Sequence, residues 1–372
     1  MCGTGALAGA LLKAQPRRLC HIGDQTMNGK VRFGMIGCGE IAVASAKSLA
    51  ASGAGEIVEA MDPVEEVAKD LAGKYGGRPT TRVEDVVGDA RVEAVIISTP
   101  HFLHAPLTIQ AAKAGKHVLV EKPIACNLKQ ADSMIAACEE ARVKLCVLLP
   151  LRFEPQAQEA KRLVAAGALG KLVGFQIRTL AEKPASYWRG GYSGRVKTDW
   201  RLSKEKSGGG VLMMNCTHDI DTMLHVTGLV LKRACAEYGT FDTPEIEVED
   251  LITVNCRFAG GEIGWIQAGS AVRGREGDVD RLYGTKGQIA FGSPLRVFVA
   301  EGFETLTANA WNEIKLGKVD TRAQVIAGFA KAVRGGGEVP VAGREARRAL
   351  EVVRAAYLSQ ERGRPVEAPV QE

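Results

Sequence analysis

A glycine-rich turn between a short apolar segment and an alanine-rich one constrains the fold of this 372-residue chain most strongly. Residues 31–36 (VRFGMI) have the character of a buried strand and run directly into GCGEIA. The pattern G-x-G-x-x-A allows a tight turn, close approach of backbone N–H groups to a pyrophosphate, and tight helix–strand packing. The turn predicts a dinucleotide site at a helix N-terminus, with a plain glycine turn as the alternative. The residues assigned to the cofactor here are Gly37, Gly39, Glu40 and Ile41.

The residue that ends the second strand favours one cofactor over another. Residues 56–61 form this strand, and Asp62 follows it, 25 residues beyond Gly37. A carboxylate at this position accepts both hydrogen bonds of the adenosine ribose diol and repels a 2′-phosphate. No Arg or Lys follows Asp62 until Lys69. The sequence therefore favours NAD over NADP, unless a basic residue from elsewhere in the chain overrides this preference.

Strands and helices alternate through the first 150 residues. Further apolar strands are expected at 92–98, 117–120 and 143–149, separated by helices near 105–114 and 127–141. This alternation predicts a doubly wound parallel sheet with both faces covered by helices. The strand ends expected to lie together on one edge are Gly37, Asp62, Thr99, Lys122 and Leu149.

The fourth of these strands ends in Glu121-Lys122-Pro123. A lysine at the carboxyl end of such a strand points into the crevice that holds the nicotinamide. There Lys122 can exchange a proton with a substrate hydroxyl while hydride moves to or from the cofactor. A surface Glu-Lys pair before a turn proline is the common alternative. The position of Lys122 relative to the glycine turn and to His218 favours the catalytic interpretation.

The second half of the chain has a different pattern. After one helix at 156–166, strands follow one another with tight glycine turns between them, which predicts an antiparallel sheet. The expected strands are 171–180, 231–239, 249–258, 262–272, 280–283 and 288–291, and helices return at 323–334 and 344–361.

These patterns predict an α/β protein. We expect an N-terminal Rossmann domain with a doubly wound parallel sheet, and a C-terminal α+β domain with an open, mainly antiparallel sheet. The expected divisions are a disordered extension at 1–28, with Met27 as a possible natural start, the NAD(P)-binding domain at 29–150, the substrate and oligomerisation domain at 151–320, and helices at 321–372 that pack back on both domains.

One helix interrupts the second sheet. Ser207-Gly208-Gly209-Gly210 precedes residues 211–228, in which apolar residues recur at helical spacing. The glycines allow a backbone to approach a ligand, and the helix presents His218 to it. A buried core histidine is the alternative. A zinc site from His218, Asp221 and His225 lacks further ligands, so no metal is expected.

Bulk properties exclude several classes of function. The net charge of +5 is spread among interspersed acidic and basic residues, which argues against nucleic-acid binding. Nine cysteines without CxxC pairs suit reduced thiols. No run approaches the roughly 20 apolar residues of a membrane span. Arg17-Arg18 follows an apolar segment instead of preceding one, so no export signal is expected. We therefore predict a cytoplasmic protein that binds neither membrane nor nucleic acid.

Five sequence blocks in order resemble the Gfo/Idh/MocA oxidoreductases, and the resemblance covers residues 31–366. They are GCGEIA, STPHFLHAPLTIQAAKAGKHVLVEKPIA, LRFEP, DWRLSKEKSGGGVLMMNCTHDID and GTKGQIAFG. The resemblance implies a Rossmann domain followed by an α/β domain whose open sheet mediates homodimers or homotetramers. It also implies oxidation or reduction of a secondary hydroxyl or carbonyl on a sugar, inositol or related polyol.

The resemblance also implies residue roles. Lys122 matches the lysine that contacts cofactor and substrate, and His218 matches the proton donor or acceptor after the triple glycine. Positions matching or adjoining the cofactor lining are Ser98, Thr99, Pro100, His101, His104, Glu121 and Arg152. Positions assigned to the substrate are Trp200, Arg201, Asn215 and Asp219.

One departure from the family pattern concerns the proton-transfer group. Many members have aspartate four residues before the histidine, where this chain has Met214. A thioether cannot orient or charge-stabilise an imidazole. Asn215, Asp219 or Asp221 are candidates to replace it in part. His101 likewise stands where asparagine is frequent.

Three functions are compatible with these residues. The first is an NAD-dependent dehydrogenase in which Lys122 and His218 bracket the reacting oxygen. The second is a redox-neutral glycosidase or lyase that uses NAD transiently, and the third is a non-catalytic dinucleotide-binding sensor. Residues 187–199 are expected on a loop near the pocket that selects the substrate, with a solvated excursion as the alternative.

Overall fold

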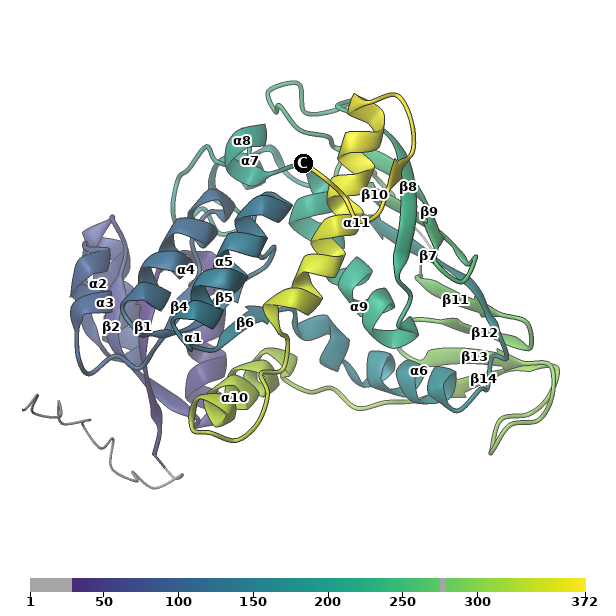
Figure 1. The fold of residues 1–372 in the computed structure, drawn as a ribbon, viewed down its shortest axis with the longest axis horizontal. Helices are drawn as coiled ribbons and strands as arrows, with labels where there is room; N and C mark the ends of the chain where they lie inside the picture. The colour runs from purple at the N-terminus through teal and green to yellow at the C-terminus, as the bar shows by residue number, and fades with distance from the viewer. Residues whose placement is uncertain (1–28, 275–278) are drawn as a thin grey trace, which may run out of the picture.

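The computed structural model describes residues 29–274 and 279–372, so the predicted extension at 1–28 lies outside the described residues. Two sheets lie side by side, and helix α11 (Gly343–Glu361) lies between them (Figure 1). In the described part of the chain, the seven cysteines are all free. None of the helices in that part has both the length and the apolar character needed to cross a bilayer.

The N-terminal sheet has six strands in the order β3-β2-β1-β4-β5-β6, and every neighbouring pair is parallel. This arrangement confirms the predicted doubly wound sheet, with β3 as an additional edge strand. The strands are β1 (Val31–Ile36), β2 (Gly55–Met61), β3 (Arg78–Thr80), β4 (Ala94–Ile97), β5 (His117–Glu121) and β6 (Leu145–Leu148). The helices are α1 (Glu40–Ser52), α2 (Glu65–Tyr75), α3 (Val83–Gly88), α4 (His104–Lys113) and α5 (Leu128–Glu140).

Polar and apolar residues do not alternate along the central strands, because these strands are buried on both faces. All four residues of β4 are buried, because helices cover both faces of the sheet. Parallel strands end at the same edge, so the carboxyl ends of β1, β2, β4 and β5 bring the glycine turn, Asp62, Thr99 and Lys122 to one side. This edge faces the second domain.

The second sheet has nine strands in the order β14-β13-β12-β11-β7-β10-β9-β8-β15. Only β7 and β10 pair in parallel within it, which confirms a mainly antiparallel sheet. The strands are β7 (Leu172–Leu180), β8 (Leu231–Gly239), β9 (Leu251–Phe258), β10 (Ile263–Gly269), β11 (Arg281–Gly284), β12 (Gly287–Ala290), β13 (Leu295–Val299), β14 (Ala310–Ile314) and β15 (Val366–Glu367). The sequence did not predict β13, β14 or β15.

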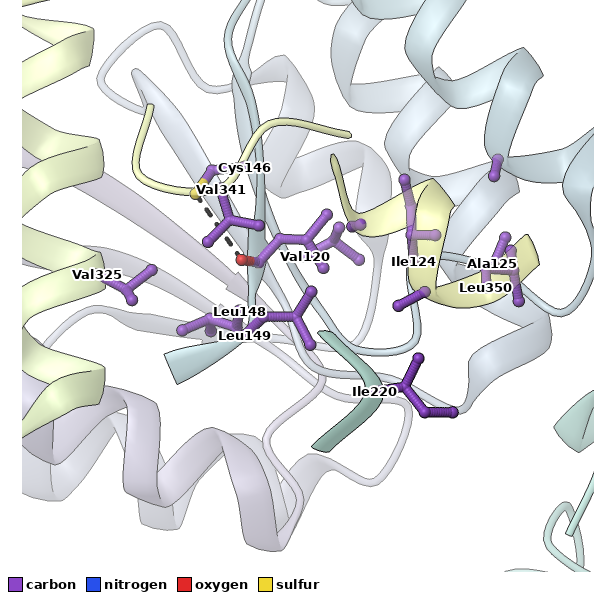
Figure 2. Close-up of a cluster of buried hydrophobic side chains, with 14 of the residues drawn as sticks. Val120, Ile124, Ala125, Cys146, Leu148, Leu149, Ile220, Val325, Val341 and Leu350 are labelled. Carbon is purple, nitrogen blue, oxygen red and sulfur yellow. Dashed lines mark hydrogen bonds between the residues drawn. The ribbon is translucent and has the colours of Figure 1, made fainter. Parts of the chain in front are cut away.

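The remaining helices of the described residues lie on this sheet, between the two sheets or against the first domain. They are α6 (Pro155–Ala165), α7 (Ala185–Gly190), α8 (Lys204–Ser207), α9 (Thr217–Thr227), α10 (Thr321–Val333) and α11. Helix α10 packs on α1, while α11 packs on α5, α9 and β8. The segment before α11 also runs beside β6, where Val147 N donates to the Val341 carbonyl at 3.0 Å. Figure 2 shows buried side chains from β5, β6, α9, α10 and α11 in one apolar cluster.

A buried ion pair connects the two halves of the molecule. Arg152 lies in the 3₁₀ turn Pro150–Phe153 after β6, and its side chain is 3% exposed. Its guanidinium donates to both carboxylate oxygens of Asp221 on α9, at 2.9 Å from Nε and 2.6 Å from Nη2. Glu345 on α11 accepts a third hydrogen bond, at 3.2 Å. Because α9 carries His218, this pair helps to fix that helix against the end of the parallel sheet.

Candidate functional site

The glycine turn is shaped to receive a bound anion. Gly37 has a φ of 87°, and a Cβ added there would lie 2.8 Å from the Ser98 carbonyl oxygen. Gly39 is the N-cap of α1 and supplies no side-chain cap, while a Cβ added there would meet nothing within 4 Å. The first N–H groups of a helix have no intrahelical acceptor. With open space above Gly39, they fit a pyrophosphate.

Polar groups beside this turn are also available to a ligand. Ser98 Oγ and Thr99 Oγ1 are buried at the end of β4, and neither has a hydrogen-bond partner among the described residues. Asp62 accepts hydrogen bonds from the N–H of Cys38 at 2.9 Å and of Val64 at 3.0 Å, which holds its carboxylate beside the turn. Buried polar groups without partners are unfavourable unless a ligand or water satisfies them. The residues present therefore fit a dinucleotide.

Two predicted histidines tie segments of the site together. His104 begins α4, and its ring nitrogens lie 2.8 Å from the Pro123 carbonyl oxygen and 3.1 Å from that of Thr99. It thus connects the ends of β4 and β5. His101 follows Pro100 in a 3₁₀ turn, and its Nδ1 lies 2.8 Å from the Ser207 carbonyl oxygen of the second domain. Both rings are buried, and their hydrogen bonds hold these segments of the chain together.

Lys122 lies directly after β5 at the edge that faces the second domain. Its Nζ donates to the carbonyl oxygen of Met214. Burial lowers the pKa of Lys122 to about 8, while Glu121 opposes this shift. Glu121 itself pairs with Arg322 on α10 and accepts a hydrogen bond from Ser45. The Glu121 carboxylate is therefore held by α10, and the Lys122 amine is directed to the triple-glycine block.

His218, on α9, is the second predicted proton-transfer residue. Its Nδ1 is buried and has no hydrogen-bond partner among the residues that the structure describes. Burial lowers the pKa of His218 well below its usual value, and the positive charges of Lys122 and Arg322 add to this effect. The imidazole is thus neutral near pH 7. His218 lies close enough to Lys122 for the lysine charge to act on it, and the proton-transfer roles of the two residues stay a prediction.

Met214 gives the His218 imidazole no carboxylate partner, and its backbone binds Lys122 instead. Residues Leu212–Cys216 form a π-helical turn immediately before α9. The Met214 side chain packs in a small apolar cluster with Tyr187 and Trp188, whereas its carbonyl oxygen accepts the Lys122 hydrogen bond. π-turns alter the regular helical hydrogen-bond pattern and are frequent at functional sites. The acceptor is a main-chain atom, which no residue type in the sequence could reveal.

The three polar residues considered as replacements for the missing carboxylate have different surroundings. Asp221 is committed to Arg152. Asp219 accepts a 2.6 Å hydrogen bond from Thr179 on β7, and burial raises its pKa to about 6. The pKa of nearby Asp280 is raised to about 7 by burial and by the Asp219 charge. Asp219 thus faces the second sheet beside a carboxyl group that the sequence did not single out. Asn215, the third, lies half-buried in the π-turn.

We call residues 181–202 the bridging segment. Its aromatic and cationic side chains form the side of the candidate site that belongs to the second domain. The Trp200 ring lies 4.4 Å from that of His101, and the Arg201 guanidinium lies 4.5 Å from the Trp200 ring centre. Lys183 Nζ lies 4.0 Å from the Tyr187 ring centre and donates to the Tyr192 hydroxyl at 2.5 Å. Burial lowers the pKa of Lys183 to about 8, with further contributions from Lys122 and Arg201. The sequence did not single out Lys183.

Arg152 occupies a different environment from the one expected. Its guanidinium is bound to Asp221 and Glu345, and it lines a cavity of about 410 Å³ with His225 and Arg348, which does not include Lys122. This arrangement favours a structural role for Arg152 over contact with the nicotinamide.

The parallel sheet, the anion-binding turn and the lysine–histidine pair define the class of a two-domain nicotinamide-dependent oxidoreductase. Family comparisons agree. Residues 31–149 match the model for the oxidoreductase family with an NAD-binding Rossmann fold, and residues 157–290 match the GFO/IDH/MocA C-terminal domain. The chain belongs to the Gfo/Idh/MocA family of oxidoreductases.

Characterised relatives share most of the length of this chain. 1,5-Anhydro-D-fructose reductase of Ensifer adhaerens is 29% identical over 88% of this chain and 97% of its own length. Inositol 2-dehydrogenase of Rhizobium meliloti is 24% identical over 88% of this chain and 96% of its own. The WlbA dehydrogenase of Bordetella pertussis, solved with NADH and UDP-GlcNAcA, has a TM-score of 0.81, with 24% identity over 93% of this chain and all of its own. This structural likeness supports the shared fold.

Proposed function

We propose that this protein transfers hydride between a nicotinamide cofactor and a secondary hydroxyl or carbonyl of a sugar, inositol or related polyol. The observation that carries the proposal is the desolvated amine of Lys122, which donates to the Met214 carbonyl just before the helix of His218. The names of the relatives, which include a sugar reductase and an inositol dehydrogenase, support the substrate class.

In this proposal the chain's own residues position the substrate and move its proton. The bound nicotinamide would supply the hydride acceptor or donor. Lys122 and His218 bracket the reacting oxygen, and the uncharged Lys122 amine takes the hydroxyl proton during oxidation. The Met214 carbonyl orients this amine. The wall formed by Trp200 and Arg201 faces the sugar, with Asp219 and Asn215 as further polar contacts.

A substrate screen tests the proposal directly. Sugars, inositols and sugar acids are incubated with NAD and with NADP, and NAD(P)H is followed by absorbance. We expect steady accumulation with at least one polyol. Conversion of a glycoside without net NADH would instead indicate redox-neutral chemistry. Dinucleotide binding without any turnover would indicate a sensor.

The rate of oxidation should depend on the protonation of Lys122. Because its pKa is lowered to about 8, the amine that acts as base is scarce at pH 6.5 and predominant at pH 9. We expect kcat/KM for oxidation to rise about tenfold per pH unit below 8 and to level off above it, and the reverse reaction to fall through the same range. Initial rates in constant-ionic-strength buffers measure this profile. A flat profile between pH 6.5 and 9 would contradict the role of Lys122.

We also propose that the outer face of the second sheet forms a homodimer or homotetramer interface. Trp265 on β10 is 41% exposed and stacks on Tyr283 of β11 at 5.6 Å, and Trp311 on β14 is 37% exposed. Exposed aromatic groups gathered on one surface are typical of protein interfaces.

Introducing a charge on this sheet face should disrupt the assembly. We expect Trp265→Glu to shift sedimentation from a dimer or tetramer to a monomer, because an unpaired carboxylate would be buried at the interface. The control is Phe241→Ser, which replaces a 73% exposed aromatic residue outside the strands. An unchanged sedimentation coefficient for Trp265→Glu would argue for another interface.

A further inference from the structure

The bridging segment crosses from the second domain to the glycine turn. It leaves the sheet after β7 and returns to α8, and in between it contacts the Rossmann domain. The N–H of Tyr192 donates to Glu40, the first residue of α1, at 3.0 Å. Arg195 reaches further along the same surface. Residues far apart in the sequence thus meet at the place where a dinucleotide enters the fold.

The Arg195 guanidinium is held against the ribose end of this site. Its Nε donates to the Cys38 carbonyl at 3.0 Å, Nη1 to Asp70 at 2.6 Å, and Nη2 to the Val67 carbonyl at 3.3 Å. The N–H of Cys38 is in turn bound by Asp62 at 2.9 Å. The same residue of the glycine turn is therefore contacted by a carboxylate on its N–H and by a guanidinium on its carbonyl.

We propose that Arg195 recognises the 2′-phosphate of NADP and lets this chain bind NADP beside Asp62. A carboxylate at the end of β2 disfavours that phosphate, and a nearby arginine accommodates it. Among residues 29–274 and 279–372, three of the five guanidinium N–H groups of Arg195 have acceptors, which leaves two for phosphate oxygens. The inference rests on the proposed function only in that a nicotinamide dinucleotide binds to this chain. It does not depend on which substrate the protein uses.

The neighbouring charges allow Arg195 to turn toward a phosphate. Asp70 also pairs with Lys74 at 2.8 Å, so its carboxylate keeps a cationic partner when Arg195 moves. Lys69, the first basic residue after Asp62 in the sequence, pairs with Glu65 at the exposed surface of α2. Arg195 is 19% exposed and already lies at the turn. The basic group that the sequence near Asp62 lacks thus comes from the second domain.

Fluorescence titration with NADPH and NADH tests this role without any substrate. We expect the wild-type protein to bind NADPH within about tenfold of NADH. Arg195→Gln should weaken NADPH binding about 10- to 100-fold, the range for hydrogen bonds to charged groups, and NADH binding less than threefold. Arg195→Lys should be intermediate, because it keeps the charge without the bidentate geometry. Arg82→Gln is the control, since Arg82 lies at the exposed surface of the same domain.

Two results would overturn the proposal. Unchanged NADPH affinity in Arg195→Gln would show that Arg195 does not contact the 2′-phosphate. Equal losses for NADPH and NADH would assign it to the pyrophosphate or to folding of the bridging segment. If Arg195→Gln fails to fold, Arg195→Lys still decides the question through its ratio of NADPH to NADH affinity. These titrations contain no substrate. A substrate screen without turnover would therefore count against the proposed substrate class and not against the role of Arg195.

Discussion

Replacing Lys122 with methionine should lower kcat for polyol oxidation about 10²- to 10⁴-fold, the usual contribution of a general acid–base group. Methionine fills a similar volume at the end of β5 but cannot accept a proton or donate to the Met214 carbonyl. The dinucleotide contacts at the glycine turn and Asp62 stay intact. NADH affinity should therefore remain within about threefold of wild type. Steady-state rates and NADH fluorescence titration measure the two effects separately.

The control for this change is Lys129→Met, which makes the same substitution at an exposed residue of α5. It should leave both kcat and NADH affinity unchanged. If Lys122 and His218 act on the same oxygen, Lys122→Met combined with His218→Asn should lose little more than the more damaging single variant. Turnover of Lys122→Met within threefold of wild type would remove Lys122 from the mechanism.

Truncating Asp221 to alanine should destabilise the fold by about 3–5 kcal/mol, because the buried Arg152 guanidinium would lose its main partner. Both side chains are at most 3% exposed, so water cannot replace the carboxylate easily. For a chain of this length the loss corresponds to a fall of about 4–6 °C in the thermal midpoint. Differential scanning calorimetry measures it.

A paired substitution distinguishes the lost ion pair from simple loss of volume. Arg152→Met together with Asp221→Leu replaces both charges with apolar groups, and it should recover most of the stability lost in Asp221→Ala. The same variants test the assignment of Arg152. If Arg152 contacts the nicotinamide, Arg152→Met/Asp221→Leu should weaken NADH binding more than tenfold. We expect less than a threefold change.

Much of the fold was predictable because burial leaves clear patterns in the sequence. The apolar strands of the parallel sheet and the glycine turn appear where the sequence places them. The missed strands are chiefly edge strands. β3 contains Pro79, which belongs at an edge because it lacks an N–H donor, and β15 has two residues. β14 and β15 form the two edges of the second sheet. Such strands depend on pairing with distant segments instead of on a pattern of their own.

The candidate site divides in the same way. The sequence could place Lys122 and His218 near one another, since one ends a buried strand and the other follows a triple glycine on an amphipathic helix, while their roles stay a prediction. The Met214 carbonyl was not predictable, because a main-chain acceptor in a π-turn has no side-chain signature. Arg195 and Lys183 come from the bridging segment, whose path between domains is set by tertiary contacts. The family resemblance placed Arg152 near the cofactor, whereas in the structure its guanidinium donates to the Asp221 carboxylate on α9.

The pairing of Glu121 with Arg322 has a consequence for synthesis on the ribosome. The carboxylate next to Lys122 finds its cationic partner 201 residues later in the chain. Domains fold largely in the order in which they emerge, so the Rossmann half can form its sheet while α10 is still untranslated. Until Arg322 arrives, Glu121 would be a buried charge without that partner. The glycine turn can therefore form before α10 has been translated. The strand that precedes Lys122 reaches its final electrostatic environment only when α10 packs against the domain.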